Sequence, residues 1–165
     1  MHAPLGVYAV LGNHDWWYGA PRVRAAFARA GIRVIDDQAQ RIERSGGAFW
    51  IAGISDYTEG PHDVRRTLGQ VSDGAPVLAI THNPDVFPEI PARVSLTLAG
   101  HTHGGQVALP LVGALVVPSR YGNRYAAGPI VESGRHLYVT TGIGTSMIPV
   151  RFGVPPEVVF LEVSR

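Results

Sequence analysis

The chain has 165 residues, of which 45% are hydrophobic, with a formal net charge of +1 and no cysteine. This composition predicts one globular domain over residues 1–165 and excludes disulfides and thiolate metal sites. A net charge near zero without a basic run argues against a nucleic-acid-binding surface. We find no apolar stretch long enough to cross a bilayer and no signal peptide, so the localisation is unknown, with the cytoplasm as the default expectation.

The first two-thirds of the chain predicts alternating strands and helices. Several short apolar runs are typical of buried strands, and the spacing of apolar residues after Pro21 is that of an amphipathic helix. The sequence Ser-Gly-Gly at 45–47 indicates a hairpin turn. We expect strands at Val7–Leu11, Ile32–Ile35, Ala39–Arg44, Ala48–Ile54, Val77–Ile80 and Val94–Ala99, helices at Pro21–Ala30 and Pro61–Val71, and a helical turn at Pro84–Ile90.

The remaining third is punctuated by glycine, proline and aromatic residues. Such punctuation favours short strands and long loops. Strands are expected at Ile130–Glu132, Leu137–Thr141 and Val158–Val163. Alternating strands and helices followed by a β-rich part predict the α/β class, with a β-sandwich flanked by helices.

Three loops that follow predicted strands carry histidine. They read Gly-Asn-His-Asp at 12–15, Thr-His-Asn-Pro at 81–84 and Gly-His-Thr-His-Gly-Gly-Gln at 100–106. One histidine after a strand is more often an ordinary polar residue than a ligand, but three such loops at one sheet edge favour a metal site. Imidazole and amide donors suit Zn, Mn or Fe(II) better than Ca or Mg. On an extended segment, His101 and His103 would point to the same side.

These motifs, in this order, resemble those of the calcineurin-like metallophosphoesterase superfamily. The stretch Tyr138–Ser146, with Pro149–Phe152 and Pro155–Glu157, is similar to the bacterial YkuE/YaeI-like branch of that superfamily. The resemblance implies a metallophosphoesterase-like sandwich and metal-dependent hydrolysis of a small phosphoester substrate. It favours a phosphodiester over a phosphomonoester.

The resemblance also implies roles for individual residues. Asn13, His82 and His101 would ligate one divalent ion, and His103 would ligate a second ion about 4 Å away. Mn, Zn and Fe are the candidate metals. His14 would contact the phosphate and protonate the leaving oxygen, which suits an imidazole. Asp15 would either orient His14 through a hydrogen bond or cap the following segment, and both interpretations stay open.

Two motifs of the superfamily, Asp-x-His and Gly-Asp-x-x-Asp, do not occur in the chain, which therefore resembles an N-terminally truncated member. In the superfamily these motifs supply carboxylate ligands, and their strands cover the edge of the strand expected at Val7–Leu11. One hypothesis is a homo-oligomer that pairs through this exposed edge. Its partner copy would supply carboxylates from Asp36, Asp37 or Asp56, although ordinary loop acids are the alternative.

Two further hypotheses concern activity. A single metal at Asn13, His82 and His101 would support weak hydrolysis, with open positions for water or phosphate. Alternatively, the chain is a remnant that binds a metal or a partner without turnover.

Other residues have two interpretations each. The aromatic run after the first loop either lines a pocket or packs over the helix at Pro21–Ala30, and we favour packing. A second aromatic loop either offers a guanidinium to a phosphate or lies on the surface. These residues are Trp16, Trp17 and Tyr18 in the first case, and Arg120, Tyr121, Asn123, Arg124 and Tyr125 in the second. We expect His2, His62 and His136 to be ordinary surface residues.

Overall fold

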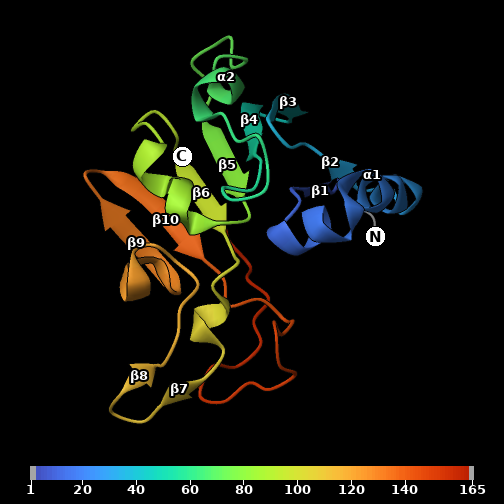
Figure 1. Ribbon diagram of the computed structural model, residues 1–165. Coiled ribbons are helices and arrows are strands. Elements are labelled where there is room, and N and C mark those ends of the chain that lie inside the picture. Colours follow the sequence, from blue (N-terminus) through green and yellow to red (C-terminus); the bar gives the residue numbers. More distant parts are fainter. Residues whose placement is uncertain (1–2, 164–165) are drawn as a thin grey trace.

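The computed structural model describes residues 3–163 and has an α/β architecture, built on a six-stranded mixed sheet (Figure 1). The strand order is β3-β4-β5-β6-β10-β9. The four central strands run parallel, and β3 and β9 pair antiparallel at the two edges. The strands are β3 (Gln38–Arg44), β4 (Gly47–Ile54), β5 (Val77–Thr81), β6 (Leu96–Ala99), β9 (Gly128–Glu132) and β10 (Arg135–Val139).

Short helices provide side chains that pack against one face of this sheet. They are α2 (Val64–Leu68), the 3-10 helix η1 (Pro84–Glu89) and the 3-10 helix η3 (Gly122–Tyr125). Phe87 of η1 and Tyr125 of η3 are fully buried and meet edge to face, with ring centroids 5.8 Å apart. Both rings belong to the main hydrophobic core, which also contains the apolar side chains of β4, β5 and β10. Burial of large aromatic rings is a major contribution to such a core.

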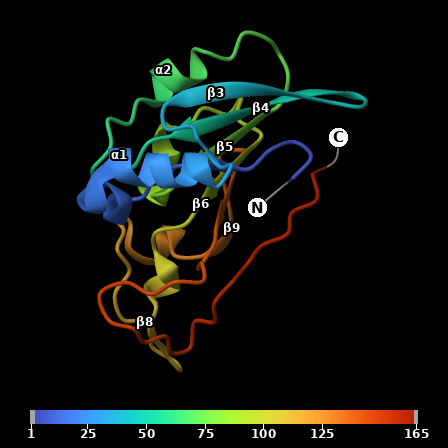
Figure 2. The same cartoon turned by 90° about the vertical axis from the view of Figure 1, so that its right-hand side faces the viewer.

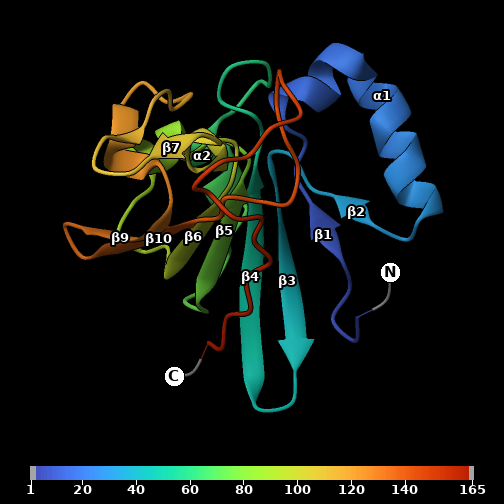
Figure 3. The ribbon, with the colours of Figure 1, turned by 90° about the horizontal axis from the view of Figure 1, so that it is seen from below.

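A second, smaller sheet lies beside the β3 edge of the main sheet (Figures 1 and 3). It consists of β1 (Tyr8–Ala9) paired in parallel with β2 (Arg33–Val34). Tyr8 and Ile35 from this region pack with Ile42, Ile51 and Ile80 of the main sheet. The long helix α1 (Asn13–Arg29) connects β1 to β2 and is kinked at Gly19, whose φ is 114°.

Residues 103–114, which follow β6, lie at the lower end of the molecule in Figures 1 and 2. The 3-10 helix η2 (His103–Gly105) leads into a small hairpin of β7 (Ala108–Leu109) and β8 (Gly113–Ala114). The later segment 142–153 lies alongside, since Val107 and Phe152 form a parallel bridge. No helix within residues 3–163 is long and apolar enough to cross a membrane.

The α/β class is confirmed, as are the hairpin of β3 and β4 and the positions of the two parallel strands β5 and β6. The strand expected at Val158–Val163 is wrong, because these residues are in no strand within the described part of the chain. The strand expected at Val7–Leu11 is reduced to two residues. Over residues 3–163 it pairs with β2 alone, so it is not part of the main sheet.

Two helix boundaries also differ from expectation. The helix expected at Pro21–Ala30 is confirmed by the part of α1 that follows the kink at Gly19. The part before the kink was not expected, and it begins at Asn13, where the carbonyl of Gly12 accepts hydrogen bonds from the N–H groups of Asp15 and Trp16. The second helix begins at Val64 rather than at Pro61, because the side chain of Asp63 caps it at that point. His2 lies outside the described residues.

Candidate metal centre

The two parallel strands β5 and β6 are neighbours, so the loops that follow them lie side by side. His82 directly follows β5, and His101 comes two residues after β6. The backbone N–H of Gly100 donates to the carbonyl of His82 at 3.0 Å, which joins the two loops. The sheet therefore places both imidazoles at one edge, as parallel strands with a common direction require.

Asn13 reaches the same place from the start of α1. Its Oδ1 lies 3.1 Å from Nε2 of His82, and Nδ1 of His101 lies 3.1 Å from that same nitrogen. Nε2 of His82 thus has two neighbouring atoms that can each present a lone pair. Nε2 of His82 can carry only one proton, so it can hydrogen-bond to both Oδ1 of Asn13 and Nδ1 of His101 only by sharing that proton between them. A cation placed among the three lone pairs would satisfy all of them.

Burial lowers the pKa of His82 to about 4, and the nearby ring of His101 acts in the same direction, whereas Asp56 and Asp15 oppose the shift. Burial also lowers the pKa of His101, although Asp56 and Asp85 oppose it. Both rings are therefore neutral near pH 7. A neutral imidazole is the form that ligates a metal ion.

The donor set fits a divalent ion that accepts nitrogen and oxygen ligands. Within residues 3–163, however, no three histidine, cysteine, aspartate or glutamate side chains come together in a way that would hold a metal. The centre thus depends on the amide of Asn13 as its third donor and carries no negative charge among its ligands. It would leave coordination positions open for water or for an anion.

Gly12 lies against the ring of His82. A Cβ on Gly12 would be 2.7 Å from each of three atoms of that ring, Nδ1, Cε1 and Nε2. Such a distance is too short for a carbon contact, so only glycine permits this approach. The glycine of the first loop therefore sets the position of a histidine from the second loop.

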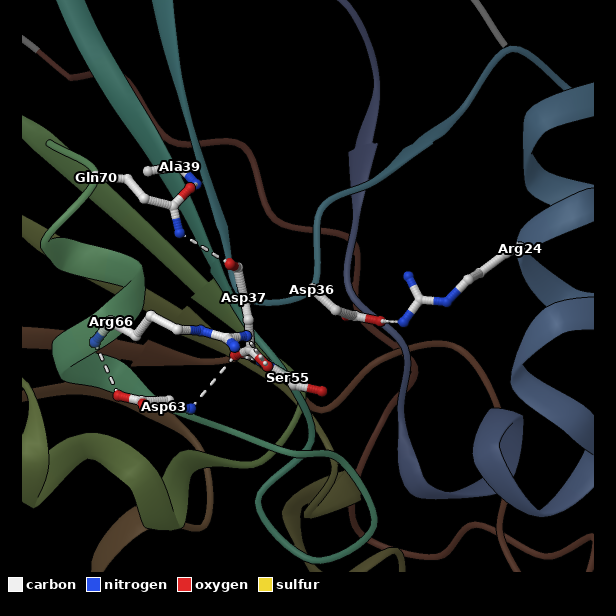
Figure 4. Close-up of polar contacts among 8 residues, drawn as sticks. All are labelled: Arg24, Asp36, Asp37, Ala39, Ser55, Asp63, Arg66 and Gln70. Carbon is white, nitrogen blue, oxygen red and sulfur yellow. Dashed lines mark hydrogen bonds and ion pairs between the residues drawn. The ribbon is translucent and has the colours of Figure 1, made fainter.

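A buried pair of aspartates fixes the strand ends around this centre (Figure 4). Asp36 accepts a hydrogen bond from the N–H of Leu11 at 2.9 Å and forms an ion pair with Arg24 of α1 at 2.6 Å. Asp37 points the other way and accepts from the N–H of Ser55 at 3.1 Å. Asp36 thus ties the first metal loop to its helix, and Asp37 ties β3 to the end of β4.

This network favours the interpretation of Asp36 and Asp37 as ordinary loop acids. They are not available as donors to another copy, because both are buried and bonded within their own chain. Asp56 is also fully buried, with Oδ1 accepting from Thr58 and Glu59. Its Oδ2 has no partner among the described residues. Burial of Asp56 likewise argues against its reaching into a partner's site.

His103 is turned toward Arg151 rather than into the group of three donors. Its Nδ1 lies 3.3 Å from Nη2 of Arg151, and burial together with the arginine's charge lowers the pKa of His103. The backbone is not extended here, since φ is 68° at His101 and 52° at His103. The expectation that both rings point to the same side of an extended segment is therefore wrong.

His14 is exposed at the rim of the site. Its Nε2 lies 3.4 Å from Oγ of Ser146, and its ring lies 4.8 Å from that of Trp17 between centroids. The carboxylate of Asp15 accepts from the N–H of Gly12 at 2.9 Å. Over residues 3–163 no hydrogen bond joins Asp15 to His14, so the geometry favours the capping interpretation of Asp15.

The aromatic run after the first loop was expected either to line a pocket or to pack over the helix, and the arginines of the second aromatic loop either to meet a phosphate or to lie on the surface. Trp16 is half-buried, and the ring of Tyr18, although mostly exposed, lies 4.7 Å from the guanidinium carbon of Arg22 on the helix. Packing over the helix is not seen for Trp17, which is 61% exposed. Arg124 forms an ion pair with Glu132 at 2.6 Å, and Arg120 donates to the hydroxyl of Tyr57 at 2.6 Å. In this structure both guanidinium groups are bound to side chains of their own chain.

Arg151 is a site residue that we did not single out as one from the sequence. Its guanidinium donates to the carbonyls of Thr141, Gly142 and Gly144 and thereby holds the glycine-rich loop against His103. The signal that could have identified it is an arginine placed between apolar residues, five positions after the run of small residues that ends at Ser146. Long-range contacts of this kind carry no periodic pattern.

Comparison with known proteins shows relatives along almost the whole chain. The chain is 33% identical to the "Uncharacterized metallophosphoesterase YkuE" of Bacillus subtilis over 161 residues, which cover 96% of this chain and 56% of YkuE. It is 35% identical to the "Phosphodiesterase YaeI" of Escherichia coli over 161 residues, or 94% of this chain and 57% of YaeI. An "Uncharacterized metallophosphoesterase" of Aquifex aeolicus is 30% identical, with 99% of this chain and 62% of the relative covered.

This chain therefore spans little more than half the length of the curated relatives that it matches. No family model matches it, and no solved structure does. The similarity nevertheless extends over the three histidine loops and the C-terminal motifs. The resemblance of this chain to the metallophosphoesterases YkuE and YaeI, expected from the motifs, is therefore confirmed over 94–96% of its length.

Proposed function

We propose that this chain takes part in metal-dependent hydrolysis of a phosphoester, with Asn13, His82 and His101 holding a divalent ion. The observation that carries the proposal is the convergence of their three donor atoms, each 3.1 Å from its neighbour in the series. A phosphodiester is the favoured substrate class, and the name of the relative YaeI supports this preference. The resemblance to the superfamily supports the reaction type.

A bound ion would polarise a phosphoryl oxygen and lower the pKa of a coordinated water. The protein's own contribution is to hold three neutral donors in fixed positions. Gly12 packs against His82, and the strand pair β5–β6 fixes the spacing of His82 and His101. Such preorganisation lowers the reorganisation that a reaction requires.

His14 is the proposed proton donor to the leaving oxygen. Its ring is exposed next to the three donors, and its charge contributes to the lowered pKa of both His101 and His103. The hydroxyl of Ser146 at 3.4 Å and the ring of Trp17 limit how the imidazole can turn. In this proposal Asp15 does not contact His14. It caps the start of α1 by accepting a hydrogen bond from the N–H of Gly12.

His103 is the proposed ligand of a second ion. It brings one nitrogen and no carboxylate, and two close dications need negative charge to offset their repulsion. The number of ions, one or two, therefore depends on carboxylates from outside the set described above. A homo-oligomer through the free edge of β1 stays a proposal, but its carboxylates would have to be others than the buried Asp36, Asp37 and Asp56. Mn, Zn and Fe are the candidate metals.

Hydrolysis of bis(p-nitrophenyl) phosphate and of p-nitrophenyl phosphate, measured with each metal in turn, tests the proposal. We expect metal-dependent turnover that is faster on the diester and falls to background in His82→Ala and His101→Ala. His136→Ala is the matched control, because His136 is exposed on β10 away from the three loops. Turnover unchanged in the first two variants would show that the centre does not carry the activity.

The alternative function is binding of a metal without turnover. It is favoured by the neutral ligand set, which lacks the negative charge of a complete two-metal site. Metal bound by the wild type and lost in His82→Ala, together with no hydrolysis of either ester, would support this alternative.

A further inference from the structure

We propose that the buried carboxylate of Asp56 is the counter-charge of the proposed metal centre. The inference rests on that centre, formed by Asn13, His82 and His101, and names the side chain whose negative charge offsets the charge of the ion. Asp56 acts through its charge and is not itself a ligand. Within residues 3–163 no three histidine, cysteine, aspartate or glutamate side chains come together in a way that would hold a metal.

Asp56 follows a strand that lies next to the strand of His82. The strands β4, β5 and β6 run parallel and are neighbours in the sheet (Figure 1). Ile54, the last residue of β4, pairs with Thr81, the last residue of β5. Asp56 comes two residues after Ile54, and His82 directly follows Thr81. The sheet therefore brings the buried acid and the first histidine ligand to the same edge, in adjacent loops.

The side chain of Asp56 is fully buried, and only one of its two oxygens has donors. Oδ1 accepts from the N–H groups of Thr58 and Glu59, both at 2.9 Å, and from the hydroxyl of Thr58 at 2.7 Å. Oδ2 is buried as well, but it has no hydrogen-bond partner within residues 3–163. The loop is closed by the N–H of Gly60, which donates to the carbonyl of Asp56 at 3.0 Å. A buried carboxylate oxygen without a donor is unfavourable unless a cation lies nearby.

No basic side chain within residues 3–163 forms an ion pair with Asp56. The other buried aspartates near the strand ends differ in this respect, since Asp36 is paired with Arg24 and Asp37 with Arg66. Buried charges in proteins are in general paired with a side chain or compensated by a metal ion. A metal ion is therefore the cation that fits beside Asp56.

The charge of Asp56 acts on both histidine ligands. Burial lowers the pKa of His82 and of His101, and in both rings Asp56 opposes this shift more than any other charge does. A negative charge that acts on both rings also attracts an ion that both rings ligate. Asp56 would thus supply the attraction that three neutral ligands lack.

Two other acids near the centre are less suited to this role. Both oxygens of Asp85 have donors of their own, the hydroxyl of Ser119 at 2.6 Å and the N–H of Arg120 at 2.8 Å. Asp15 is only half-buried, so water weakens the effect of its charge. Asp56 combines full burial with an oxygen that has no donor in the described chain. Its charge is therefore the one that an ion would compensate.

Isothermal titration of the full chain with zinc tests the inference. Asp56→Asn keeps an oxygen that can accept from Thr58 and Glu59 but removes the charge. We expect it to bind zinc about 10- to 100-fold more weakly than the wild type does. Asp56→Ser is a second neutral variant and should lose affinity in the same way, so that misfolding of one leaves the other informative.

Urea unfolding of the metal-free proteins separates this role from a role in folding. Removal of a buried charge that has no partner should leave Asp56→Asn at least as stable as the wild type. A marked loss of metal-free stability in this variant would contradict the inference, because the carboxylate would then be compensated by the chain itself.

Glu132→Gln is the matched control, because it also removes one negative charge. Glu132 pairs with Arg135 at the start of β10, which runs parallel to β6, so it lies at the opposite end of the strands from the metal centre. It should bind zinc as the wild type does. An equal loss of affinity in Glu132→Gln and Asp56→Asn would overturn the inference, since net charge rather than the position of Asp56 would then decide.

The titration also distinguishes this inference from the metal centre on which it rests. Wild-type affinity for zinc in both neutral variants of Asp56 would overturn the inference and leave the metal centre in place. A wild type that does not bind zinc would overturn the metal centre, and the inference with it.

Discussion

Replacing Gly12 by alanine tests how the first loop positions the metal centre. The new Cβ would meet Nδ1, Cε1 and Nε2 of His82 at 2.7 Å. Ordinary contact begins at 3.4 Å, so the ring must retreat by the difference, about 0.7 Å. Because three ring atoms are equally close, rotation of the ring within its plane does not relieve the contact. The backbone of Gly12 has φ of −94°, so alanine meets no backbone strain there.

The consequence for the metal follows from this displacement. Ligand positions in metal sites tolerate deviations of about 0.2 Å, and the required movement exceeds that. We expect Gly12→Ala to weaken metal binding by about 10- to 100-fold, which corresponds to about 1.4–2.8 kcal/mol. Overpacking should also destabilise the fold by about 1–3 kcal/mol.

Isothermal titration with zinc, followed by urea unfolding of the same samples, measures both effects. Gly74→Ala is the matched control, because a Cβ there meets nothing within 4 Å. It should bind zinc as the wild type does. If Gly12→Ala also binds zinc with wild-type affinity, His82 is not held where the structure places it, and the reasoning fails.

Three further predictions follow. In the metal-free protein the pKa of His82 is about 4, against an ordinary 6.5. Between pH 6.5 and pH 4 the unfolded chain therefore binds a proton that the folded chain does not. The free energy of unfolding should fall by up to about 3 kcal/mol as the pH drops through this range. Urea unfolding at several pH values should show this slope in the wild type and a smaller slope in His82→Gln, in which the lowered pKa values of His101 and His103 still contribute. Asp36→Ala leaves the buried N–H of Leu11 unpaired and should cost about 2 kcal/mol by urea unfolding, whereas loss of the exposed side chain in Glu59→Ala should cost little. Arg151→Gln removes a cation beside His103 and should raise the pKa of that imidazole in an NMR titration, and an unchanged value would mean that the two side chains do not interact.

The meeting of His82 and His101 could be predicted because it depends on a local pattern. Each follows an apolar run, and two such runs read as parallel strands place their carboxyl ends together. Asn13 was expected near the two histidines because it would follow a strand of the same sheet. Its strand is not in the main sheet, and the side chain arrives instead on the first turn of α1.

The parts that the sequence did not predict depend on tertiary contacts or on left-handed backbone. The residues after Glu157 form an apolar run typical of a strand, but in the described chain no neighbour pairs with them, and a strand forms only when it pairs. His101 and His103 adopt positive φ, which is uncommon outside glycine and has no signal in a histidine motif. The buried position of Asp36 depends on Leu11 and Arg24, which are 25 and 12 residues away.

The most direct test of the account is the metal content of the purified protein, measured by elemental analysis beside His82→Ala and His136→Ala, with the oligomer mass from light scattering. The account predicts about one ion or more per chain in the wild type and in His136→Ala, and a loss of that ion in His82→Ala. A mass that shows a dimer with two ions per chain would place the missing carboxylates in a partner copy. Metal content that is absent from the wild type, or unchanged in His82→Ala, would contradict the assignment of Asn13, His82 and His101 as the metal centre.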